Sequence, residues 1–246
     1  MNPAFRQTFD VSALHVDRYG RAKPSALLYF AQEAAGGHCL DLSVDWDALA
    51  KKHLFWAVIR HRVQVTRLPK LGETITVETW PMPTTRVAYP RSTAAYDADG
   101  KELFRSVSLW VLMDTETRAM ILPGKSGVEV QGALTGTELA VPGSIAPKAL
   151  KNATRNRVGF AELDRNGHMN NTRYLDWIDN LLPSEFHASY PVREFTICYL
   201  SEAREGQQID LHWELLDGPS LQIDAQSHPL CDTAEPVRVF SAQVHF

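Results

Sequence analysis

The sequence predicts an α+β fold made of two similar halves, in each of which an antiparallel sheet wraps around one central helix. In each half a short strand precedes one helix, and three or four strands follow that helix. Between the halves, the segment GALTGTELAVPGSIAP (132–147) is rich in Gly, Pro and Thr, which is typical of a linker. We therefore expect an N-terminal domain over 1–131, a linker over 132–150 and a C-terminal domain over 151–246, with the halves packed as a pseudo-dimer.

The predicted helix of the first half is PSALLYFAQEAAGGH (24–38). Pro24 suits the first turn of a helix, and Gly36 and Gly37 suit its end. The segments that follow are rich in Val, Ile, Thr, Trp and Tyr, and DADG (97–100) predicts a hairpin turn. The predicted strands are 54–65, 74–80, 86–97 and 103–114.

The predicted helix of the second half is NTRYLDWIDNLL (171–182), which Asn170 or Asn171 can cap and Pro183 ends. Apolar residues recur along it at helical spacing, and these are Tyr174, Leu175, Ile178, Leu181 and Leu182. The predicted strands lie near 193–200, 208–215, 219–226 and 236–246.

An internal repeat relates the two halves. VDRYGRAKPSALLYF (16–30) aligns with LDRNGHMNNTRYLDW (163–177), and RVQVTRLPKLGETITV (62–77) aligns with TICYLSEAREGQQIDL (196–211). The first half carries extra residues between the two matches, around 41–53. Such a repeat predicts that both halves are built on one framework.

The repeat also separates the two halves by their chemistry. Asp17 and Gly20 of the first half match Asp164 and Gly167 of the second. Three other positions differ, because Asn166 aligns with Tyr19, His168 with Arg21, and Glu202 with Leu68. Only the second half carries the full polar set, so we expect the chemistry there.

Composition excludes several classes of function. The chain has 246 residues, 44% hydrophobic and 22% charged, and its net charge of −4 gives no basic field for nucleic acid. No apolar run approaches the roughly 18 residues of a membrane span. The N-terminus resembles neither a signal nor a transit peptide, so we expect a cytoplasmic protein, of bacterial rather than plastid type.

Cysteines and histidines predict neither a disulfide framework nor a metal site. Cys39, Cys198 and Cys231 are odd in number, far apart and without a Cys-x-x-Cys pair, which indicates a reducing compartment. The nine histidines show no metal-ligand spacing, and no Gly-rich phosphate loop follows a strand. We expect no metal and no cofactor.

The segment LDRNGHMNN (163–171) carries the candidate chemistry. Asn166 and His168 can donate hydrogen bonds to a carbonyl just before a helix, where developing negative charge is favoured, and Asp164 can orient a neighbour. Glu202 lies just after a strand and can remove a proton from water. No nucleophile accompanies the set, because Cys198 reads as a buried strand residue. The set therefore suits attack of water on a thioester, whose thiol leaves readily.

Each of these features also has a purely structural reading. Asp-x-Asn-x-His before a helix is more often capping and turn chemistry, and a single loop glutamate is usually solvated. The basic run KALKNATRNR, with Lys148, Lys151, Arg155 and Arg157, is either a solvated linker or a docking site for an acidic partner.

Three segments in this order resemble the acyl-acyl carrier protein (acyl-ACP) thioesterases of plants and bacteria, and these are 54–80, 106–118 and 163–178. The resemblance covers nearly the whole chain. It implies two tandem hotdog domains and hydrolysis of acyl-ACP thioesters to free fatty acid, which ends chain elongation. It assigns the catalytic positions to Asp164, Asn166, His168 and Glu202, with Glu202 as general base, and the acyl pocket to the first half. Ala203 stands where many plant relatives have a cysteine, so a thiol nucleophile is not expected there.

Two other functions stay open on the same fold. An acyl-CoA thioesterase would act on the same phosphopantetheine arm, and a non-catalytic acyl-binding protein would be expected to lose the polar set in both halves. The expected partner is ACP carrying a phosphopantetheine-linked acyl chain. Fusion of two hotdogs is compatible with a monomer or a homodimer, and the chain length of the acyl group depends on a pocket depth that the sequence does not give.

Overall fold

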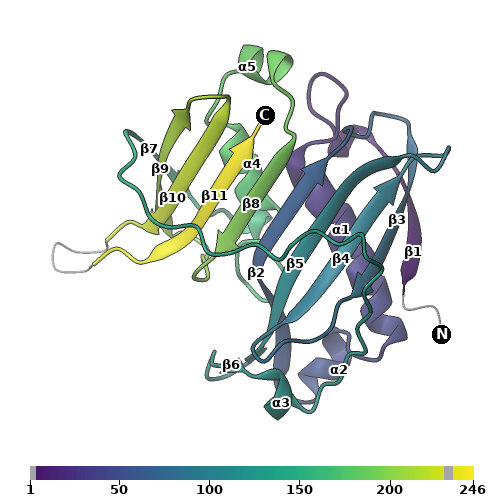
Figure 1. Ribbon diagram of the computed structural model, residues 1–246. Coiled ribbons are helices and arrows are strands. Elements are labelled where there is room, and N and C mark those ends of the chain that lie inside the picture. Colours follow the sequence, from purple (N-terminus) through teal and green to yellow (C-terminus); the bar gives the residue numbers. More distant parts are fainter. Residues whose placement is uncertain (1–3, 230–234) are drawn as a thin grey trace. The chain divides into compact units, whose positions relative to one another are not determined.

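The computed structural model describes residues 4–229 and 235–246, and Figure 1 shows the arrangement of helices and strands within its parts. The chain divides into two compact units, the first ending at Pro142 and the second beginning at Gly143. This division lies inside the segment 132–147. Each unit is an antiparallel sheet accompanied by helices, so the predicted α+β fold is confirmed.

Unit 1 contains a sheet in the order β1-β3-β4-β5-β2, with β6 added beside β5. The strands are β1 (Phe5–Asp10), β2 (Leu54–Val65), β3 (Thr74–Pro81), β4 (Tyr89–Tyr96), β5 (Glu102–Asp114) and β6 (Met120–Ile121). The four long predicted strands are therefore confirmed. The DADG turn is confirmed too, since Asp97 accepts the backbone N–H groups of Asp99 and Lys101 and Gly100 has a φ of 77°.

The helix of unit 1, α1 (Pro24–Asp41), is longer than predicted and passes through both glycines. Pro24 begins it as expected, but Gly36 and Gly37 do not end it. A Cβ at Gly37 would lie 2.7 Å from the ring of Phe5 on β1, so this glycine permits a close approach of helix and strand. The expectation that the glycines end the helix was wrong because packing, not helix termination, selects Gly37.

The extra residues of the first half form a small helical insertion. It contains α2 (Trp46–Ala50), which Asp45 caps by accepting the N–H groups of Asp47 and Ala48. Val44 and Leu49 of this insertion pack into an apolar cluster with Leu54, Leu112 and Val128. Two short helical segments complete unit 1, and these are η1 (Ala13–His15) and α3 (Pro123–Ser126).

Buried polar side chains lie between α1 and the sheet of unit 1. Arg91 of β4 is 7% exposed, and its Nη1 lies 3.1 Å from Nδ1 of His38. Burial, and then the positive charge of Arg91, lower the pKa of His38 to about 4. Burial also lowers the pKa of His61 on β2 to about 3. Both histidines are therefore neutral in the folded protein near neutral pH.

Residues 132–142 are not a free linker, because hydrogen bonds fasten them to the sheet of unit 1. The N–H of Ala133 donates to the carbonyl of Pro81, and Trp80 donates to the carboxylate of Glu138 at 3.0 Å. Burial alone would raise the pKa of Glu138, but hydrogen bonds to its carboxylate from the backbone and hydroxyl of Thr135 and from Trp80 lower that pKa to about 2. At Gly132 a Cβ would lie 2.2 Å from the backbone of Met82, so this segment follows the strand end closely.

Unit 2 contains a sheet in the order β8-β11-β10-β9-β7. Its strands are β7 (Asn152–Arg157), β8 (Glu194–Tyr199), β9 (Gln208–Leu216), β10 (Ser220–Ser227) and β11 (Arg238–His245). The last four lie close to the predicted bounds, and β7 is the short strand expected before the helix. The helices are η2 (Phe160–Glu162), α4 (Arg173–Asp179) and α5 (Ser184–Ser189). The prediction of one helix over 171–182 was wrong at both ends: α4 is shorter, and Leu181 and Leu182 lie beyond it.

Helix α4 packs one face against the sheet of unit 2. Tyr174, Leu175 and Ile178 are each at most 3% exposed, as the apolar stripe predicted. The ring of Tyr174 lies 4.9 Å from that of Phe240 on β11 and 5.4 Å from that of Tyr199 on β8. These contacts position the segment that precedes α4 over one end of the sheet.

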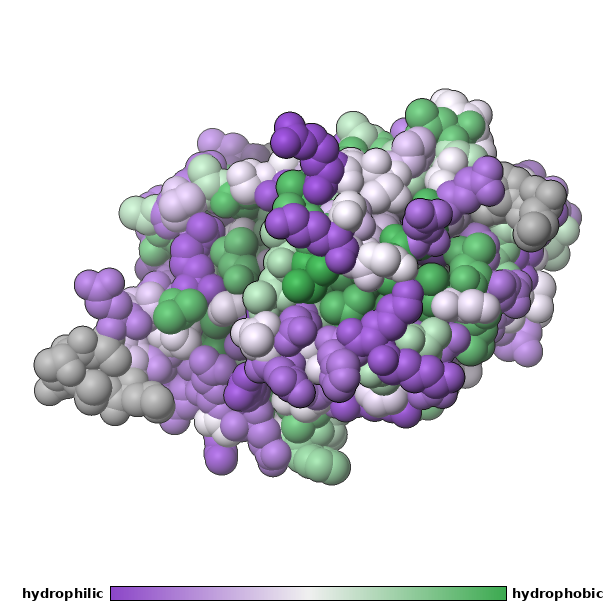
Figure 2. Space-filling model, turned by 90° about the horizontal axis from the view of Figure 1, so that it is seen from below, coloured by the Kyte–Doolittle hydropathy of each residue, from purple (hydrophilic) through white to green (hydrophobic). Residues whose placement is uncertain are grey.

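Hydrophilic side chains cover much of the face seen in Figure 2, with apolar side chains between them. Across the described part of the chain, no helix combines the length and apolar character needed to cross a membrane.

Candidate active site

The residues 164–168 form a tight turn that the carboxylate of Asp164 organises. Its Oδ1 accepts the N–H of Asn166 at 2.8 Å and the N–H of His168 at 3.3 Å. The N–H of Gly167 donates to the carbonyl of Asp164, and Gly167 has a φ of 76°, which favours glycine. Asp164 therefore holds the backbone that carries Asn166 and His168.

The same turn occurs in unit 1 with other side chains. Oδ1 of Asp17 accepts the N–H of Tyr19 at 2.8 Å and that of Arg21 at 3.0 Å, and Gly20 has a φ of 74°. The guanidinium of Arg21 also donates to Asp17, at 2.9 Å. The two turns that align in the sequence thus also share the hydrogen bonds from the backbone to their aspartate. Because both halves use the aspartate in this way, it is a turn-building residue irrespective of the chemistry nearby.

His168 and Glu202 meet across two turns of unit 2. Nε2 of His168 lies 2.9 Å from Oε2 of Glu202, at hydrogen-bonding distance. The backbone of His168 pairs with that of Arg204, and the N–H of Met169 donates to the carbonyl of Ala203 at 2.8 Å. The 164–168 turn and the turn after β8 are therefore joined by the backbone, which sets the distance between the two side chains.

Arg204 is a further charged group at this pair, and it was not among the predicted site residues. Its Nη2 lies 3.4 Å from Oε2 of Glu202, the same oxygen that faces His168. The side chain of Glu202 is 31% exposed, and that of His168 is 11% exposed. One carboxylate oxygen is thus engaged by two nitrogen groups while the side chain stays accessible to water.

Tyr174 also lies at this site, although the sequence placed it only in the apolar stripe of the helix. Burial raises the pKa of its phenol, and the negative charge of Asp164 raises it further. The backbone of Ala203 hydrogen-bonds its hydroxyl. A tyrosine within an otherwise aliphatic stripe is the signal by which the sequence could have drawn attention to it.

The helix after the turn begins later than expected. Helix α4 starts at Arg173, five residues beyond His168, and its N-cap Thr172 makes no side-chain capping bond. Asn170 instead accepts the N–H and hydroxyl of Thr172, and the carbonyl of Asn171 accepts the hydroxyl of Tyr199 at 2.8 Å. The side chain of Asn170 thus makes the expected capping bond to the N–H two residues ahead, although helix α4 itself begins later, at Arg173.

The structure describes two of the three cysteines, Cys39 and Cys198. Cys198 on β8 is 1% exposed, and its Sγ lies 3.7 Å from the carbonyl of Gly143. Cys39 lies on α1 in unit 1. Cys231 lies outside the described residues. Within residues 4–229 and 235–246, no three His, Cys, Asp or Glu side chains are grouped so that they could hold a metal ion.

Two of the four cations in the basic run 148–157 form ion pairs with carboxylates of the neighbouring strand. Lys151 lies 2.5 Å from a carboxylate oxygen of Glu214, and Arg155 lies 2.5 Å from one of Asp210. Both acids belong to β9, which pairs with β7. The run is therefore partly strand rather than linker, and its paired cations are poorly suited to docking an acidic partner.

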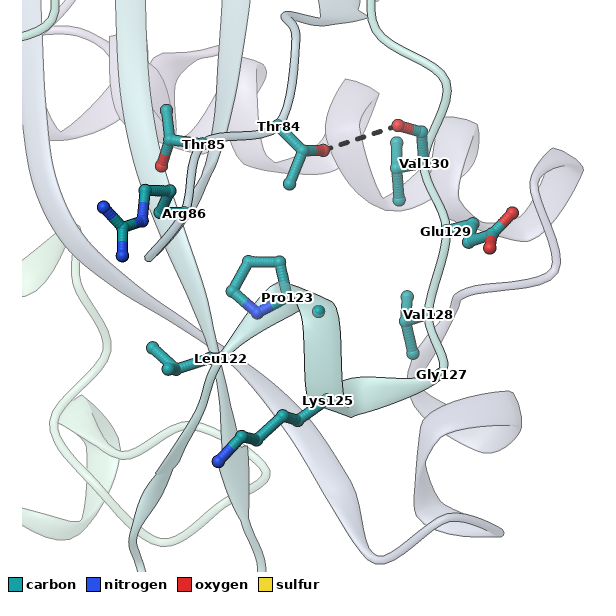
Figure 3. A pocket seen from close by; sticks show the side chains of 11 residues that line it. Thr84, Thr85, Arg86, Leu122, Pro123, Lys125, Gly127, Val128, Glu129 and Val130 are labelled. Carbon is teal, nitrogen blue, oxygen red and sulfur yellow. Dashed lines mark hydrogen bonds between the residues drawn. The ribbon is translucent and has the colours of Figure 1, made fainter.

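A pocket of about 810 Å³ lies in unit 1. Figure 3 shows it between the loop that carries Thr84 and Arg86 and the segment from Leu122 to Val130, where the hydroxyl of Thr84 donates to the carbonyl of Val130. None of Asp164, Asn166, His168 or Glu202 lines this pocket. We therefore locate the candidate chemistry at the His168–Glu202 pair, where titratable groups converge, and not at this pocket.

Two family models match the chain. The N-terminal domain of acyl-ACP thioesterases matches residues 2–122, and the C-terminal domain matches residues 145–235. A dodecanoyl-ACP hydrolase of Cinnamomum camphora is 29% identical over 80% of this chain and 56% of its own length. An oleoyl-ACP thioesterase of Coriandrum sativum is 24% identical over 84% of this chain and 61% of its own length. The chain thus spans less than two thirds of these curated relatives, both of which are named as chloroplastic.

Solved structures share the fold over the full chain. An acyl-ACP thioesterase from Bacteroides thetaiotaomicron superimposes with a TM-score of 0.88 at 23% identity, over 100% of this chain and 98% of its own. A 12:0-ACP thioesterase from Umbellularia californica gives a TM-score of 0.82 at 23% identity, over 100% and 97%. The expected tandem hotdog architecture is therefore confirmed.

Proposed function

The chain belongs to the acyl-ACP thioesterase family, and from this premise we propose that it hydrolyses acyl-ACP thioesters to free fatty acid and carrier protein. This reaction ends the elongation of the acyl chain. The observation that carries the proposal is the contact between Nε2 of His168 and Oε2 of Glu202 at 2.9 Å. It joins the accessible carboxylate of Glu202 to the imidazole of His168, which lies in the segment 163–178 that resembles the family.

Glu202 is the general base in this proposal. Its Oε2 lies 2.9 Å from His168 and 3.4 Å from Arg204, and its carboxylate accepts a proton from water as the water oxygen attacks the thioester carbonyl. The donation from His168 fixes the orientation of the carboxylate. A carboxylate that is positioned before the reaction avoids the reorganisation that it would otherwise need in the transition state.

Asn166 and His168 hold the reacting oxygen atoms. The amide of Asn166 can donate to the carbonyl oxygen, on which negative charge develops when water adds. Collapse of the tetrahedral intermediate breaks the C–S bond. The sulfur leaves as a thiol, because Glu202 returns to it the proton that was taken from water. Asp164 acts on this chemistry through the backbone of the turn, since its Oδ1 accepts the N–H groups of both Asn166 and His168.

Water, rather than a thiol, is the nucleophile in this mechanism. Position 203 is alanine and is fully buried, and Cys198 is 1% exposed on a strand. We expect Cys198→Ala to leave turnover largely intact. Loss of turnover with retained folding would revive a thiol mechanism.

The proposal includes three further points. The acyl group of the substrate is carried by a protein, the enzyme is cytoplasmic, and its source is bacterial. The relatives named above comprise plant proteins described as chloroplastic as well as a bacterial one, so they do not fix the compartment. The oligomeric state likewise stays a prediction of a monomer or a homodimer.

The test is release of free thiol from matched acyl-ACP and acyl-CoA substrates over a series of chain lengths. Turnover of acyl-ACP with weak activity on acyl-CoA is the expected result and gives the chain-length preference. A clear preference for acyl-CoA would replace the proposal with the acyl-CoA thioesterase. Release from neither substrate, with acyl ligand still bound, would indicate an acyl-binding protein.

A further inference from the structure

We propose that the carrier protein docks on an exposed surface of unit 2 beside the His168–Glu202 pair, a proposal that rests on the proposed function. The surface, which we call the arginine rim, consists of Arg157, Phe160, Arg165 and Arg204. All four side chains are exposed. It keeps Arg157 of the basic run 148–157 but not Lys151 and Arg155, which are paired with carboxylates of β9.

Arg157 is the cation of β7 that the sheet leaves without a carboxylate partner. Along the β7–β9 ladder Arg155 lies opposite Asp210 and is held by its carboxylate, whereas Arg157 lies opposite the uncharged Gln208. Lys151 is likewise held by Glu214 of β9. Within the described residues, no ion pair is formed by Arg157. An exposed guanidinium of this kind is available to an anion from outside.

The arginine rim borders the proposed active site directly. The N–H of Gly206 donates to the carbonyl of Val158 at 2.9 Å, which fixes the end of β7 beside the turn that carries Glu202. Nη2 of Arg157 lies 3.6 Å from the position that a Cβ of Gly206 would take. Arg204 of the same turn lies 3.4 Å from Glu202. A partner bound here would deliver its thioester to the adjacent carboxylate.

Phe160 supplies an apolar anchor in the arginine rim. Its side chain is 78% exposed, which is unusual for a phenylalanine. The backbone around it is held by Glu162, whose carboxylate accepts the N–H of Gly159 at 2.8 Å and the indole N–H of Trp177 at 2.6 Å. Exposed aromatic rings on a fixed backbone lose little conformational freedom on binding and are typical interface anchors.

The occupant that fits this surface is an acidic protein that carries its substrate on a phosphodiester-linked arm. The arginine rim carries three exposed guanidinium groups and one exposed aromatic ring, and Glu205 is an exposed acid of the turn that carries Arg204. Such a surface attracts acidic side chains during encounter and orients the partner. A thioester of the bare arm lacks the acidic protein, so the arginine rim would act on the carrier-bound substrate alone.

The test compares Arg157→Gln and Phe160→Ser with Arg155→Gln as the matched control. Arg155 lies two residues from Arg157 on the same strand and is already held by Asp210. Each enzyme is assayed with acyl-ACP, with acyl-CoA and with the same acyl group on N-acetylcysteamine. We expect the KM for acyl-ACP to rise about tenfold in the first two variants, as for interface hot spots, with kcat retained. Turnover of the N-acetylcysteamine thioester and all activities of Arg155→Gln should match the wild type.

Three outcomes would overturn the docking surface while leaving the proposed function standing. These are an unchanged KM for acyl-ACP, an equal loss with the N-acetylcysteamine thioester, and an equal loss with acyl-CoA. The last would mean that the phosphate of the arm, not the protein, is recognised. If the wild type cleaves none of the substrates, the proposed function fails, and binding of holo-ACP to wild type and variants, measured by calorimetry, then decides on the surface alone.

Discussion

Nε2 of His168 lies 2.9 Å from Oε2 of Glu202, although the two residues belong to separate turns of unit 2. Backbone pairing between His168 and Arg204 holds these turns together. In unit 1 the corresponding pairing joins Arg21 and Lys70, so the framework is the same, but position 68 is leucine. Both units thus contain the same backbone pairing between two turns, but only in unit 2 do these turns carry an acid and an imidazole.

Removing the base should abolish most of the turnover without loss of folding. We expect Glu202→Gln to lower kcat by about 10²- to 10⁴-fold, which is the range of general-base contributions. Thermal unfolding should change little because the side chain is partly exposed. Glu205→Gln, in the same turn, is the control and should retain activity. Near-wild-type kcat in Glu202→Gln would exclude the base assignment.

Asp164 should be replaceable by asparagine but not by alanine. An amide oxygen can still accept the N–H groups of Asn166 and His168, and the loss of charge weakens such bonds by roughly half. We therefore expect Asp164→Asn to keep kcat/KM within about tenfold, and Asp164→Ala to lose more, because a tenfold change corresponds to about 1.4 kcal/mol. Asp17→Ala removes the same turn bonds in unit 1 and should lower stability while kcat is kept. A loss in Asp164→Asn as large as in Asp164→Ala would show that the charge itself takes part.

The two glycines of α1 should respond oppositely to alanine. A Cβ at Gly36 has no neighbouring heavy atom within 4 Å, so Gly36→Ala should raise the free energy of unfolding by about 0.5–1 kcal/mol through helix propensity. At Gly37 the Cβ would lie 2.7 Å and 2.9 Å from atoms of the Phe5 ring. We expect the gain to be cancelled or reversed there. Denaturant unfolding measures both, and an equal gain at the two positions would mean that Phe5 moves aside freely.

The buried histidines should make the free energy of unfolding fall as the pH is lowered into the acidic range. His61 has a folded-state pKa of about 3 and an ordinary unfolded value near 6.5, so between these pH values the unfolded chain binds a proton that the folded chain does not. Stability from this group is present above about pH 6.5 and falls as pH drops, by about 1.4 kcal/mol per pH unit well below 6.5. His38, with a pKa of about 4, acts in the same direction.

Replacement of His61 by glutamine should flatten that dependence. The measurement is the free energy of unfolding of wild type and His61→Gln between pH 4 and 7.5. Exposed His245 provides the control, because His245→Gln should leave the slope as it is. If His61→Gln has the wild-type slope, His61 takes up its proton in the folded state and the burial argument fails.

The class of fold, the internal repeat and the family can all be predicted from the amino-acid sequence alone. Alternation of apolar residues located the strands within a few residues, because strand side chains alternate between two faces and this period survives in the letters. The polar residues Asp164, Asn166, His168 and Glu202 could be singled out because the aligned half of the same chain lacks three of them. The comparison of halves located them in the second half, and the resemblance to the thioesterase family, rather than the motif alone, raised them above ordinary turn residues.

The extent of each helix and strand, and the contacts between distant side chains, depend on the packing of the folded chain. Gly36 and Gly37 look like a helix end in the sequence, yet α1 continues because Phe5, distant in the chain, needs the space beside Gly37. The contact of His168 with Glu202, and the presence of Arg204 on the same oxygen, depend on backbone pairing between two turns. Local sequence carries local preferences, whereas such contacts depend on packing between segments far apart in the chain.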